Sequence, residues 1–515
     1  MQDLCPDRHP GKITPVPGSA AALSDRLRIF RPAGPGLSWQ DLVPILDAVA
    51  DGVRPGRGIL VDLAAIAAVT DTTVALLHDL ACRAAGRVDL AFAAPGPALG
   101  ARLDRLGLAG ALPLFPSREA ALASPVLRRH TLGHAKAVIL AAGEGSRARP
   151  LTRLTPKPLL KVLGRPILDW MIDHLASFGL HRLAINSGHL APRLEAHLAA
   201  ADAALDLRVL RERRHRAGRL EDGPVGSATT LARLAREGWI DRPVIVGCGD
   251  TLVDIDLAGM MMRHADRGNA VTIAAMEVPQ ARVSRYGILA VEENGTVRRF
   301  QEKPRPEDAA SRLASMGIYI FSPEALADLS PEAGRDIGQH LLPALLAQGT
   351  SIGIWRHRGG WCEVGTPTDL HEVNMAAARG EAPLARLAAL MRDERIHLGN
   401  GVRLGPRVRI EGPVFIGDRV EIGGNCRLVG PVVIESGARI GPGCRVENAL
   451  VLENATLSAG AQCIGTLALP PALEACGEAD RPSPVARSDA PLPLPATFEG
   501  TARPKPASRP QPAWQ

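Results

Sequence analysis

Aromatic residues make up only 3% of this 515-residue sequence, and its arginines are scattered. Because no dense basic tract alternates with aromatic side chains, the net charge of +6 does not indicate a nucleic-acid partner. The eight cysteines include no CxxC pair and no Cys/His cluster. Neither a zinc site nor a disulfide framework is therefore expected.

Signals of export and of membrane insertion are missing as well. The first residues, MQDLCPDRHPGK, contain no apolar signal-peptide core, and no apolar run is long enough to span a bilayer. We therefore expect a cytoplasmic protein without membrane contact. The hydrophobic content of 46% and charged content of 22% are typical of a globular chain, and the length predicts about three domains.

The strongest positive signal is the stretch from Lys136 to Lys161, KAVILAAGEGSRARPLTRLTPKPLLK. An apolar strand passes directly into a glycine-rich turn, which is how α/β proteins bring backbone N–H groups up to a phosphate. Glycine allows this approach because it has no Cβ. Arg147 and Lys157 add positive charge beside the turn. The stretch therefore predicts a polyphosphate site.

Two better-known phosphate loops do not fit this stretch. A Walker loop needs GxxxxGK[ST], but Lys157 lies too far along the chain and between prolines. A dinucleotide loop needs a third glycine and a helix, whereas Pro150 and Pro156 make a long rigid loop. The glycines alone would fit a tight turn. The whole string, GxGxR…PLT…PKP, resembles the signature of the sugar-1-phosphate nucleotidyltransferases, also called nucleotide-sugar pyrophosphorylases.

This resemblance implies a Rossmann-like α/β core with a mixed, mostly parallel sheet over residues 135–380. It implies that Arg147 and Lys157 are catalytic. It further implies that the nucleotide contacts Ala141, Gly143, Gly145, Ser146, Gly226 and Ser227. The last two belong to the string EDGPVGSA, which resembles the nucleobase loop of the family. By itself this string is equally consistent with a Gly/Pro turn capped by Ser227.

A metal site follows from the same resemblance. The apolar stretch PVIVGCGD ends at Asp250, which places a carboxylate at the carboxyl edge of a parallel sheet. In the family this Asp holds Mg²⁺, although Asp250 could also cap the following turn. The second metal-binding carboxylate of the family is an Asp, but here it is Glu363. Glutamate keeps the charge and reaches one methylene further, so metal preference or activity could differ.

The sugar half of the family pattern is present further along the chain. The resemblance implies that Glu302 accepts hydrogen bonds from sugar hydroxyls and that Lys303 contacts the sugar phosphate. It assigns Gly287 and Gly317 to the same sugar-phosphate site. A Glu-Lys pair at a strand end is, on its own, usually a solvated surface pair.

The N-terminal part alternates strands and helices. After a lead-in (1–24), residues 25–125 resemble the STAS domain, named for sulphate transporters and anti-sigma-factor antagonists, and a polar linker (126–134) follows. The family's strand-to-helix turn holds an Asp followed by Ser or Thr, so Thr72 and Thr73 are candidate phosphosites. The simpler interpretation is that Asp71 or Thr72 caps the helix. We expect a docking or regulatory module for a protein partner.

The C-terminal part has a period of six residues. After a connecting helix (381–396), large apolar residues recur at Leu398, Leu404, Ile410, Ile416, Ile422, Leu428, Ile434, Ile440, Val446 and Leu452. This repeat predicts a β-helix over 397–468, and it resembles the left-handed β-helix appended to many of these transferases. Ser458 breaks the row and Ile464 returns to its phase. No histidine follows His397, which argues against acetyltransferase chemistry and for assembly into a homo-oligomer. The Pro-rich tail (469–515) is expected to be disordered.

The pattern as a whole predicts an enzyme of nucleotide-sugar biosynthesis, which converts an NTP and a sugar 1-phosphate into an NDP-sugar and pyrophosphate. The core and β-helix together resemble mannose-1-phosphate guanylyltransferases, so GTP with mannose 1-phosphate is the first expectation. Glucose 1-phosphate with UTP or dTTP fits nearly the same motifs. A non-catalytic sensor that signals through the STAS-like unit is the alternative of another class, and a structural scaffold is the weakest.

Overall fold

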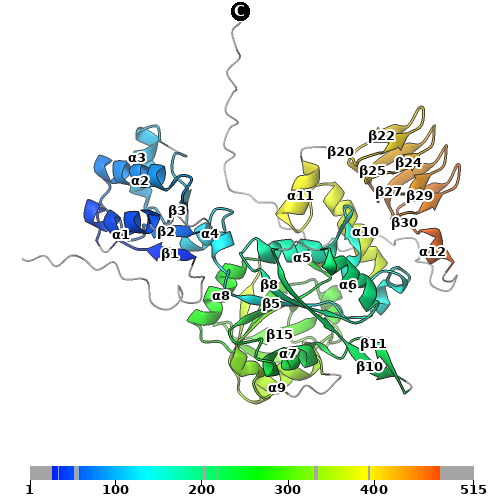
Figure 1. Cartoon of the computed structure of the whole chain (residues 1–515), viewed down its shortest axis with the longest axis horizontal. Helices are drawn as coiled ribbons and strands as arrows, with labels where there is room; N and C mark the ends of the chain where they lie inside the picture. The colour runs from blue at the N-terminus through cyan, green and yellow to red at the C-terminus, as the bar shows by residue number, and fades with distance from the viewer. Residues whose placement is uncertain are drawn as a thin grey trace, which may run out of the picture.

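The computed structural model describes residues 26–475, apart from 33, 51–56, 109, 201–203, 217, 330–334 and 393–394. Along the chain it contains an N-terminal α/β unit, a central α/β domain and a C-terminal β-helix (Figure 1). The predicted lead-in (1–24) and most of the Pro-rich tail lie outside the described residues. Within the described part, no helix combines the length and apolarity needed to cross a membrane.

The N-terminal unit is a sheet of four parallel strands in the order β1-β2-β3-β4. Its strands are β1 (Leu27–Phe30), β2 (Gly58–Asp62), β3 (Asp89–Ala93) and β4 (Leu114–Phe115). Its helices are α1 (Trp39–Ala50), α2 (Asp71–Ala84), α3 (Pro97–Arg105) and α4 (Arg118–Ala123). Successive residues of a strand point to opposite faces. Ile59 and Val61 accordingly pack with α1 to α3, whereas Leu60 joins a second buried cluster on the other face.

That second face connects the N-terminal unit to the central domain. Helix α4 contacts β3 on one side and α8 (Leu257–Asp266) of the central domain on the other. The stretch 126–134, which the sequence suggests is a polar linker, is packed instead: Leu127 and Leu132 are fully buried. Because apolar contacts continue across the junction, the unit is docked onto the central domain.

The cap of α2 differs from the prediction. The N-cap is Thr70, whose hydroxyl accepts from the N–H of Thr73, and the Thr73 hydroxyl accepts from the N–H of Thr70 in return. Neither Asp71 nor Thr72 is therefore the cap. Thr73 is buried and its hydroxyl is used in this capping box, so it is unsuited to phosphorylation, whereas Thr72 is exposed.

The central domain has a mixed sheet, as the resemblance implied, and its strand order is β16-β15-β17-β12-β5-β8-β9. Strands β12 (Val244–Cys248), β5 (Lys136–Leu140), β8 (Arg182–Ser187) and β9 (Asp206–Arg211) are parallel. The remaining strands are β14 (Val271–Glu277), β15 (Gly287–Val291), β16 (Val297–Glu302), β17 (Leu313–Phe321) and β18 (Ile352–Arg356). Strands β12, β5 and β8 are largely buried runs of β-branched and aliphatic residues, as expected where helices cover both faces, whereas most residues of the edge strand β9 are exposed or half-buried.

Helices lie on both faces of this sheet. Residues of α5 (Ile167–Ala176), α6 (Ala191–Ala199) and α8 share one buried cluster, and those of α7 (Ser227–Arg236) and α9 (Leu342–Ala347) share another. A hairpin of β10 (Arg213–Arg216) and β11 (Arg219–Asp222), which the sequence analysis did not predict, projects from the domain between β9 and α7 (Figure 1). Helices α10 (Pro367–Ala378) and α11 (Ala385–Arg392) lead to the β-helix.

The C-terminal unit consists of parallel strands stacked coil on coil, so the predicted β-helix is confirmed in outline. Its strands are β20 (Ile396–Leu398), β21 (Arg403–Leu404), β22 (Arg409–Glu411), β23 (Val414–Ile416), β24 (Glu421–Ile422), β25 (Arg427–Ile434), β26 (Arg439–Ile440), β27 (Arg445–Val451), β28 (Thr456–Leu457), β29 (Gln462–Ile464) and β30 (Leu467–Ala468). Its left-handed sense stays a prediction.

The period of six is wrong beyond Val446. Val414 pairs with Val432, eighteen residues on, but Val432 pairs with Ala449, only seventeen residues on. The inward row therefore continues through Val451, Leu457 and Cys463 instead of Leu452 and Ile464. Cys463 is buried and Ile464 is exposed. A deletion of one residue in a coil shifts every later residue, which a fixed period does not reveal.

The β-helix packs its side against the central domain. Helix α10 contacts β25 and β27, and Val433 and Leu450 share a buried cluster with Leu370. Within this junction Glu435 is 3% exposed, and burial raises the pKa of its carboxyl to about 7. A short helix, α12 (Pro471–Glu474), follows the last coil.

Glu435→Gln should remove a pH-dependent loss of stability. Between its ordinary pKa of 4.5 and about 7, the folded state keeps a proton that the unfolded chain releases, so stability falls as pH rises. This shift corresponds to about 3 kcal/mol at most. The free energy of unfolding of the variant, measured with urea, should therefore exceed that of the wild type by more at pH 8 than at pH 5. The exposed Glu421→Gln serves as control, and equal pH dependence in both variants would contradict the prediction.

Candidate active site

A cavity of about 450 Å³ lies at the carboxyl ends of β5 and β12. Ten of the residues predicted for the site line it, namely Ala141, Gly143, Gly145, Ser146, Arg147, Lys157, Gly226, Ser227, Asp250 and Glu302. Four others, Gly287, Lys303, Gly317 and Glu363, do not line it. The fold thus brings phosphate loop, nucleobase loop and carboxylates to one edge of the sheet, where open α/β sheets bind ligands.

The phosphate loop is held in place by packing around Gly145. This residue has φ +60°, and a Cβ there would lie 2.9 Å from Thr152 Cγ2 and 3.1 Å from Lys157 Cβ. The Thr152 hydroxyl donates to the Gly145 carbonyl at 2.9 Å. Only glycine fits this close approach. The N–H of Ala141 already donates to Asn186 Oδ1 at 2.5 Å, so Ala141 offers the cavity its small side chain instead of a free donor.

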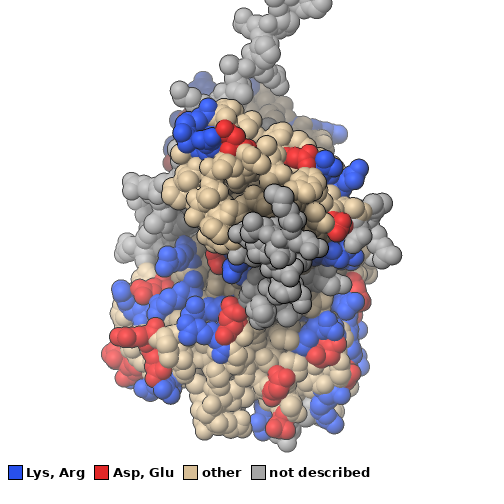
Figure 2. Space-filling model, turned by 90° about the vertical axis from the view of Figure 1, so that its left-hand side faces the viewer, with Lys and Arg blue, Asp and Glu red and all other residues tan. Residues whose placement is uncertain are grey.

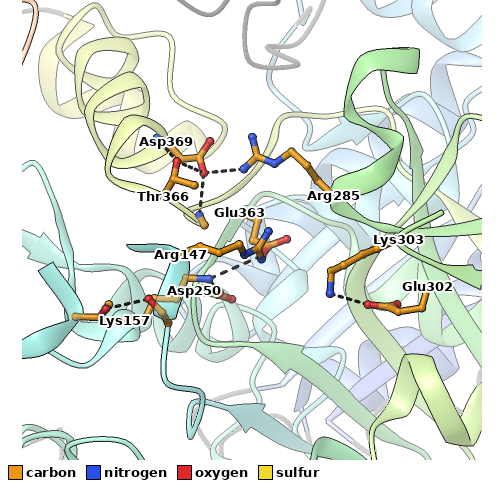
Figure 3. Close-up of polar contacts among 12 residues, drawn as sticks. Arg147, Lys157, Asp250, Arg285, Glu302, Lys303, Glu363, Thr366 and Asp369 are labelled. Carbon is orange, nitrogen blue, oxygen red and sulfur yellow. Dashed lines mark hydrogen bonds and ion pairs between the residues drawn. The ribbon is translucent and has the colours of Figure 1, made fainter. Parts of the chain in front are cut away.

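Two carboxylates and a lysine meet beside the cavity (Figure 3): Asp250 and Lys157 line it, and Glu363 pairs with Lys157 without lining it. Strand β13 (Thr251–Val253) pairs antiparallel with β19 (Trp361–Glu363), which brings Glu363 beside Asp250 across 113 residues of sequence. The Lys157 ammonium contacts Asp250 Oδ2 and lies 3.8 Å from Glu363 Oε1. Burial lowers the Lys157 pKa, but the two carboxylates outweigh it and raise the pKa above its usual value.

Arg147 completes the charge balance. Its guanidinium lies 3.7 Å from Glu363 Oε1, and its side chain is 51% exposed toward solvent. Burial, and then the charge of Asp250, raise the Glu363 pKa, while Lys157 and Arg147 oppose this. The two acids and two bases therefore offset one another, which allows the carboxylates to remain close together in a largely buried position.

A buried aspartate that sequence reasoning missed holds the loop after Glu363. Asp369 Oδ2 accepts from the Gly365 N–H at 3.1 Å, from the Thr366 hydroxyl at 2.8 Å and from Arg285 Nη2 at 2.6 Å. Figure 3 shows this group directly above Glu363. The signal in the sequence was TPTD, because Thr366 is the N-cap of α10 and Asp369 its third residue.

A second residue that sequence reasoning missed lies beside the predicted nucleobase loop. Glu212 is 4% exposed, immediately follows β9 and lines the cavity with Pro224 and Gly226. Burial raises the pKa of its carboxyl, and hydrogen bonds oppose that shift. The donors are the Thr230 hydroxyl, the Val225 N–H and the Asn186 amide. The unexpected hairpin separates Glu212 from the Gly-Pro turn, which hid their relation in the sequence.

Ser227 joins two segments and does not cap α7. Its hydroxyl donates to Asp336 Oδ2 at 2.8 Å and accepts from the Ile337 N–H at 2.9 Å. Gly226, the N-cap, has φ +105°, and a Cβ there would lie 2.2 Å from the Arg335 carbonyl. Asp336, Ile337 and Gly338 line the cavity and begin a π-helical turn (Ile337–Leu341), a conformation frequent at functional sites.

The four residues predicted for the sugar-phosphate site are a charged pair and two glycines. Lys303 Nζ lies 2.7 Å from Glu302 Oε1, and Lys303 has φ +48°, which is unusual for a residue with a Cβ. The two predicted glycines are required by packing instead: a Cβ on Gly287 would lie 2.3 Å from Phe300, and one on Gly317 would lie 3.1 Å from the Cys248 sulfur. The space beside Gly317 is thus filled by Cys248.

Two family models of known proteins match parts of this chain. A nucleotidyl transferase family model matches residues 136–380, and a bacterial transferase hexapeptide (six repeats) model matches residues 413–448. A UTP–glucose-1-phosphate uridylyltransferase of Synechocystis is 30% identical over 284 residues, which cover 55% of this chain and 73% of that protein. The chain belongs to the nucleotidyl transferase family.

Two other relatives are named for different substrates. A putative mannose-1-phosphate guanyltransferase of Sulfolobus acidocaldarius is 28% identical, over 46% of this chain and 62% of that protein. A glucose-1-phosphate adenylyltransferase of Vibrio parahaemolyticus is 29% identical, over 47% and 66%. The chain thus spans about two thirds of the length of these relatives. All three are sugar-1-phosphate nucleotidyltransferases, so the predicted enzyme class is confirmed and the substrate is not decided.

The carboxylates of this transferase suit a divalent metal. Within the described residues no group of three or more His, Cys, Asp or Glu side chains could hold a metal ion. Mg²⁺ needs only one or two carboxylates when substrate phosphates and water complete its octahedron. Asp250, which lines the cavity, and Glu363 beside it supply two hard oxygen ligands, so the residues fit such an ion.

Asp369→Asn should weaken the response to divalent metal. The change removes the charge that pairs with Arg285, so the loop carrying Glu363 is less well held. Substitutions behind a metal ligand commonly cost 10- to 100-fold in metal affinity or activity. We expect the metal concentration for half-maximal activity to rise about tenfold, with folding retained. Asp173→Asn, which breaks the exposed Arg165–Asp173 pair, is the control, and equal effects in both would contradict this role.

Proposed function

We propose that the protein transfers guanylyl groups from GTP to mannose 1-phosphate, giving GDP-mannose and pyrophosphate. The observation that carries the proposal is one cavity lined by a glycine-rich loop, two cations, Asp250 and the buried acid Glu212, with Glu363 paired to both cations beside it. The confirmed enzyme class supports the reaction type, and the guanyltransferase relative and Glu212 support the choice of nucleotide.

The reaction is an in-line displacement at the α-phosphorus. A phosphate oxygen of mannose 1-phosphate forms the new P–O bond, while the bond to the bridging oxygen of the β-phosphate breaks and pyrophosphate leaves. Such a transfer needs positioning and charge neutralisation more than a covalent nucleophile. A bound Mg²⁺ on Asp250 and Glu363 would supply Lewis-acid charge neutralisation to the phosphates.

Residues of this chain bind the phosphates and the sugar and stabilise the developing charge. Backbone groups of Gly143–Ser146 cradle the phosphates, and Arg147, exposed at the mouth of the cavity, stabilises the departing pyrophosphate. Lys157 stays protonated because its pKa is raised, so it acts as a fixed cation and not as a base. Glu302 accepts from sugar hydroxyls, and Lys303 beside it takes the sugar phosphate.

The choice of GTP depends on Glu212. Three donors occupy three of the roughly four acceptor sites of its carboxylate, which leaves one for the base. Guanine presents two adjacent donors on its pairing edge, N1–H and the N2 amine. Uracil and adenine place acceptors beside their donors, which a carboxylate repels. A buried acid in this position therefore favours guanine.

The first experiment measures pyrophosphate release with Mg²⁺ across GTP, UTP, ATP, CTP and dTTP, each with mannose and glucose 1-phosphate. We expect the highest kcat/KM with GTP and mannose 1-phosphate, and loss of turnover when the metal is chelated. Highest activity elsewhere in the grid would keep the enzyme class and replace the substrates. Binding of NTP without any pyrophosphate would favour the non-catalytic sensor.

Glu212→Gln should relax nucleotide choice. The amide puts a donor where the carboxylate only accepted, so the ratio of kcat/KM for GTP over UTP should fall at least about tenfold. Glu195→Gln, at the same sheet edge but outside the cavity, should leave the ratio unchanged. If kcat/KM of Glu212→Gln fell equally for GTP and UTP, this residue would have a purely structural role.

UTP with glucose 1-phosphate is the second candidate, favoured by the uridylyltransferase relative and by its larger share of aligned sequence. The sensor is favoured by the additional N-terminal unit and by Glu363, whose longer side chain replaces the aspartate of the family pattern. Glu363 nevertheless keeps its place beside Asp250 and Lys157, which supports catalysis over sensing.

The outer units are proposed to serve regulation and assembly. The N-terminal unit keeps its proposed STAS-like role as a docking module, with Thr72 as the accessible phosphosite. Figure 2 shows acidic and basic side chains interspersed on this side of the molecule, without a patch of one sign. The first coil of the β-helix exposes Leu398 and Leu404, which supports homo-oligomer contacts through that end.

A further inference from the structure

A second cavity, the junction cavity, lies between the central domain, the β-helix and α12, and its volume is about 330 Å³. Its apolar lining comes from the central domain, the β-helix and α12, namely Leu151, Leu154, Leu159, Leu160, Leu370, Leu452, Pro470 and Leu473. The polar lining is Thr155, Lys161, Arg193, Glu435, Glu453 and Asn454. The cavity does not share a lining residue with the active site.

The feature that points to a ligand is an unsatisfied acid. Glu435 is 3% exposed, and its Oε2 accepts from the Glu453 N–H at 2.9 Å. Its other oxygen, Oε1, is buried and has no hydrogen-bond partner among the described residues. A buried carboxyl oxygen without a donor costs stability, and native proteins rarely keep one without a reason.

The cations of the cavity are engaged elsewhere. Lys161 Nζ pairs with Glu453 Oε2 at 2.6 Å, and Arg193 donates to the Leu154 carbonyl. Among the described residues neither cation donates to Glu435, and the cavity that Glu435 lines has room for a molecule that does. Because leucines form most of the walls, that molecule needs an apolar body, and because the unmet group is an acid, it needs a donor that carries positive charge.

The position of the cavity connects it to catalysis. Its walls include Leu151, Leu159 and Leu160 of the segment 151–161, which also carries Lys157, in contact with Asp250. The short helical turns of this segment (Leu151–Arg153 and Lys157–Leu159) are separated by few residues. A body that fills the space behind them will therefore shift or stiffen the position of the Lys157 ammonium.

We propose that the junction cavity binds a small organic cation, an ammonium group on an alkyl or cyclic body, which donates to Glu435 and packs among the leucines. Occupancy regulates the transferase by setting the position of the segment 151–161. The binding half stands by itself, and the regulatory half rests on the proposed nucleotidyl transfer. The raised pKa of Glu435 supports the assignment, since an ammonium would restore the ionised form.

The test uses n-hexylammonium as probe, with hexanoate and 1-hexanol as probes of equal chain length. Calorimetry on the full chain at pH 8, without substrates, should show saturable binding of hexylammonium at one site. Hexanoate and hexanol should bind at least about tenfold more weakly, because neither satisfies the acid with a charged donor. Equal binding of the three probes, or none, would overturn the proposal.

Glu435→Gln should weaken hexylammonium binding at least about tenfold, and the matched Glu421→Gln, exposed on another sheet of the β-helix, should leave it within about twofold. If Glu435→Gln does not fold, Ala472→Trp fills the cavity from α12 with Glu435 intact and should also abolish binding. Undiminished binding in either variant would place the probe elsewhere and overturn the site.

The pH dependence and the activity give two further readouts. Binding should weaken from pH 8 to pH 6 as Glu435 takes up its proton; the charged groups that face it are Lys161, Glu453 and Arg193. Hexylammonium should change the rate of pyrophosphate release by the wild type at least twofold. It should leave the rate of the Glu435→Gln variant unchanged. Binding without a rate change overturns the regulatory half. Binding in a protein without transferase activity leaves the site supported and removes the proposed function.

Discussion

The pairing of two short strands, β13 and β19, is the constraint on which the active site depends. It places the carboxylates of Asp250 and Glu363 side by side in a largely buried position, where like charges repel and burial favours the protonated acid. Lys157 and Arg147 from the phosphate loop offset this repulsion. The loop therefore contributes the cations that make the pair of acids tolerable, besides its backbone donors. A bound divalent cation would add positive charge beside the two acids, and substrate phosphates would add negative charge beside the two bases.

Around this centre, buried acids hold the loops. Asp369 gathers three donors from the loop after Glu363 and from Arg285, and Glu212 gathers three from the nucleobase side. Each is nearly fully buried and satisfied, so each makes one loop conformation much more stable than others. Glu435 has the same burial without a full set of partners, which is why it stands out as a binding group.

The three units share buried surfaces. The N-terminal sheet packs through α4 on α8, which begins seven residues after Asp250, and the β-helix packs on α10, which follows Glu363. Both outer units thus touch helices that are joined to Asp250 or Glu363 by a few residues. This continuity gives a physical route by which either unit can influence the site.

Local patterns in the sequence determined much of this protein. The glycine-rich loop, the strand that ends at Asp250 and the hexapeptide row are short or periodic signals, and Arg147, Lys157, Asp250 and Glu302 do meet in one cavity. Tertiary structure alone decided the partners that come from distant segments: Asp369 with Arg285, Glu212 with Val225, and Glu435 facing the core. It also decided the one-residue shift after Val446, the cap at Thr70 and the packing of residues 126–134. These depend on which surfaces exclude water together, and one-dimensional periodicity contains no information about that.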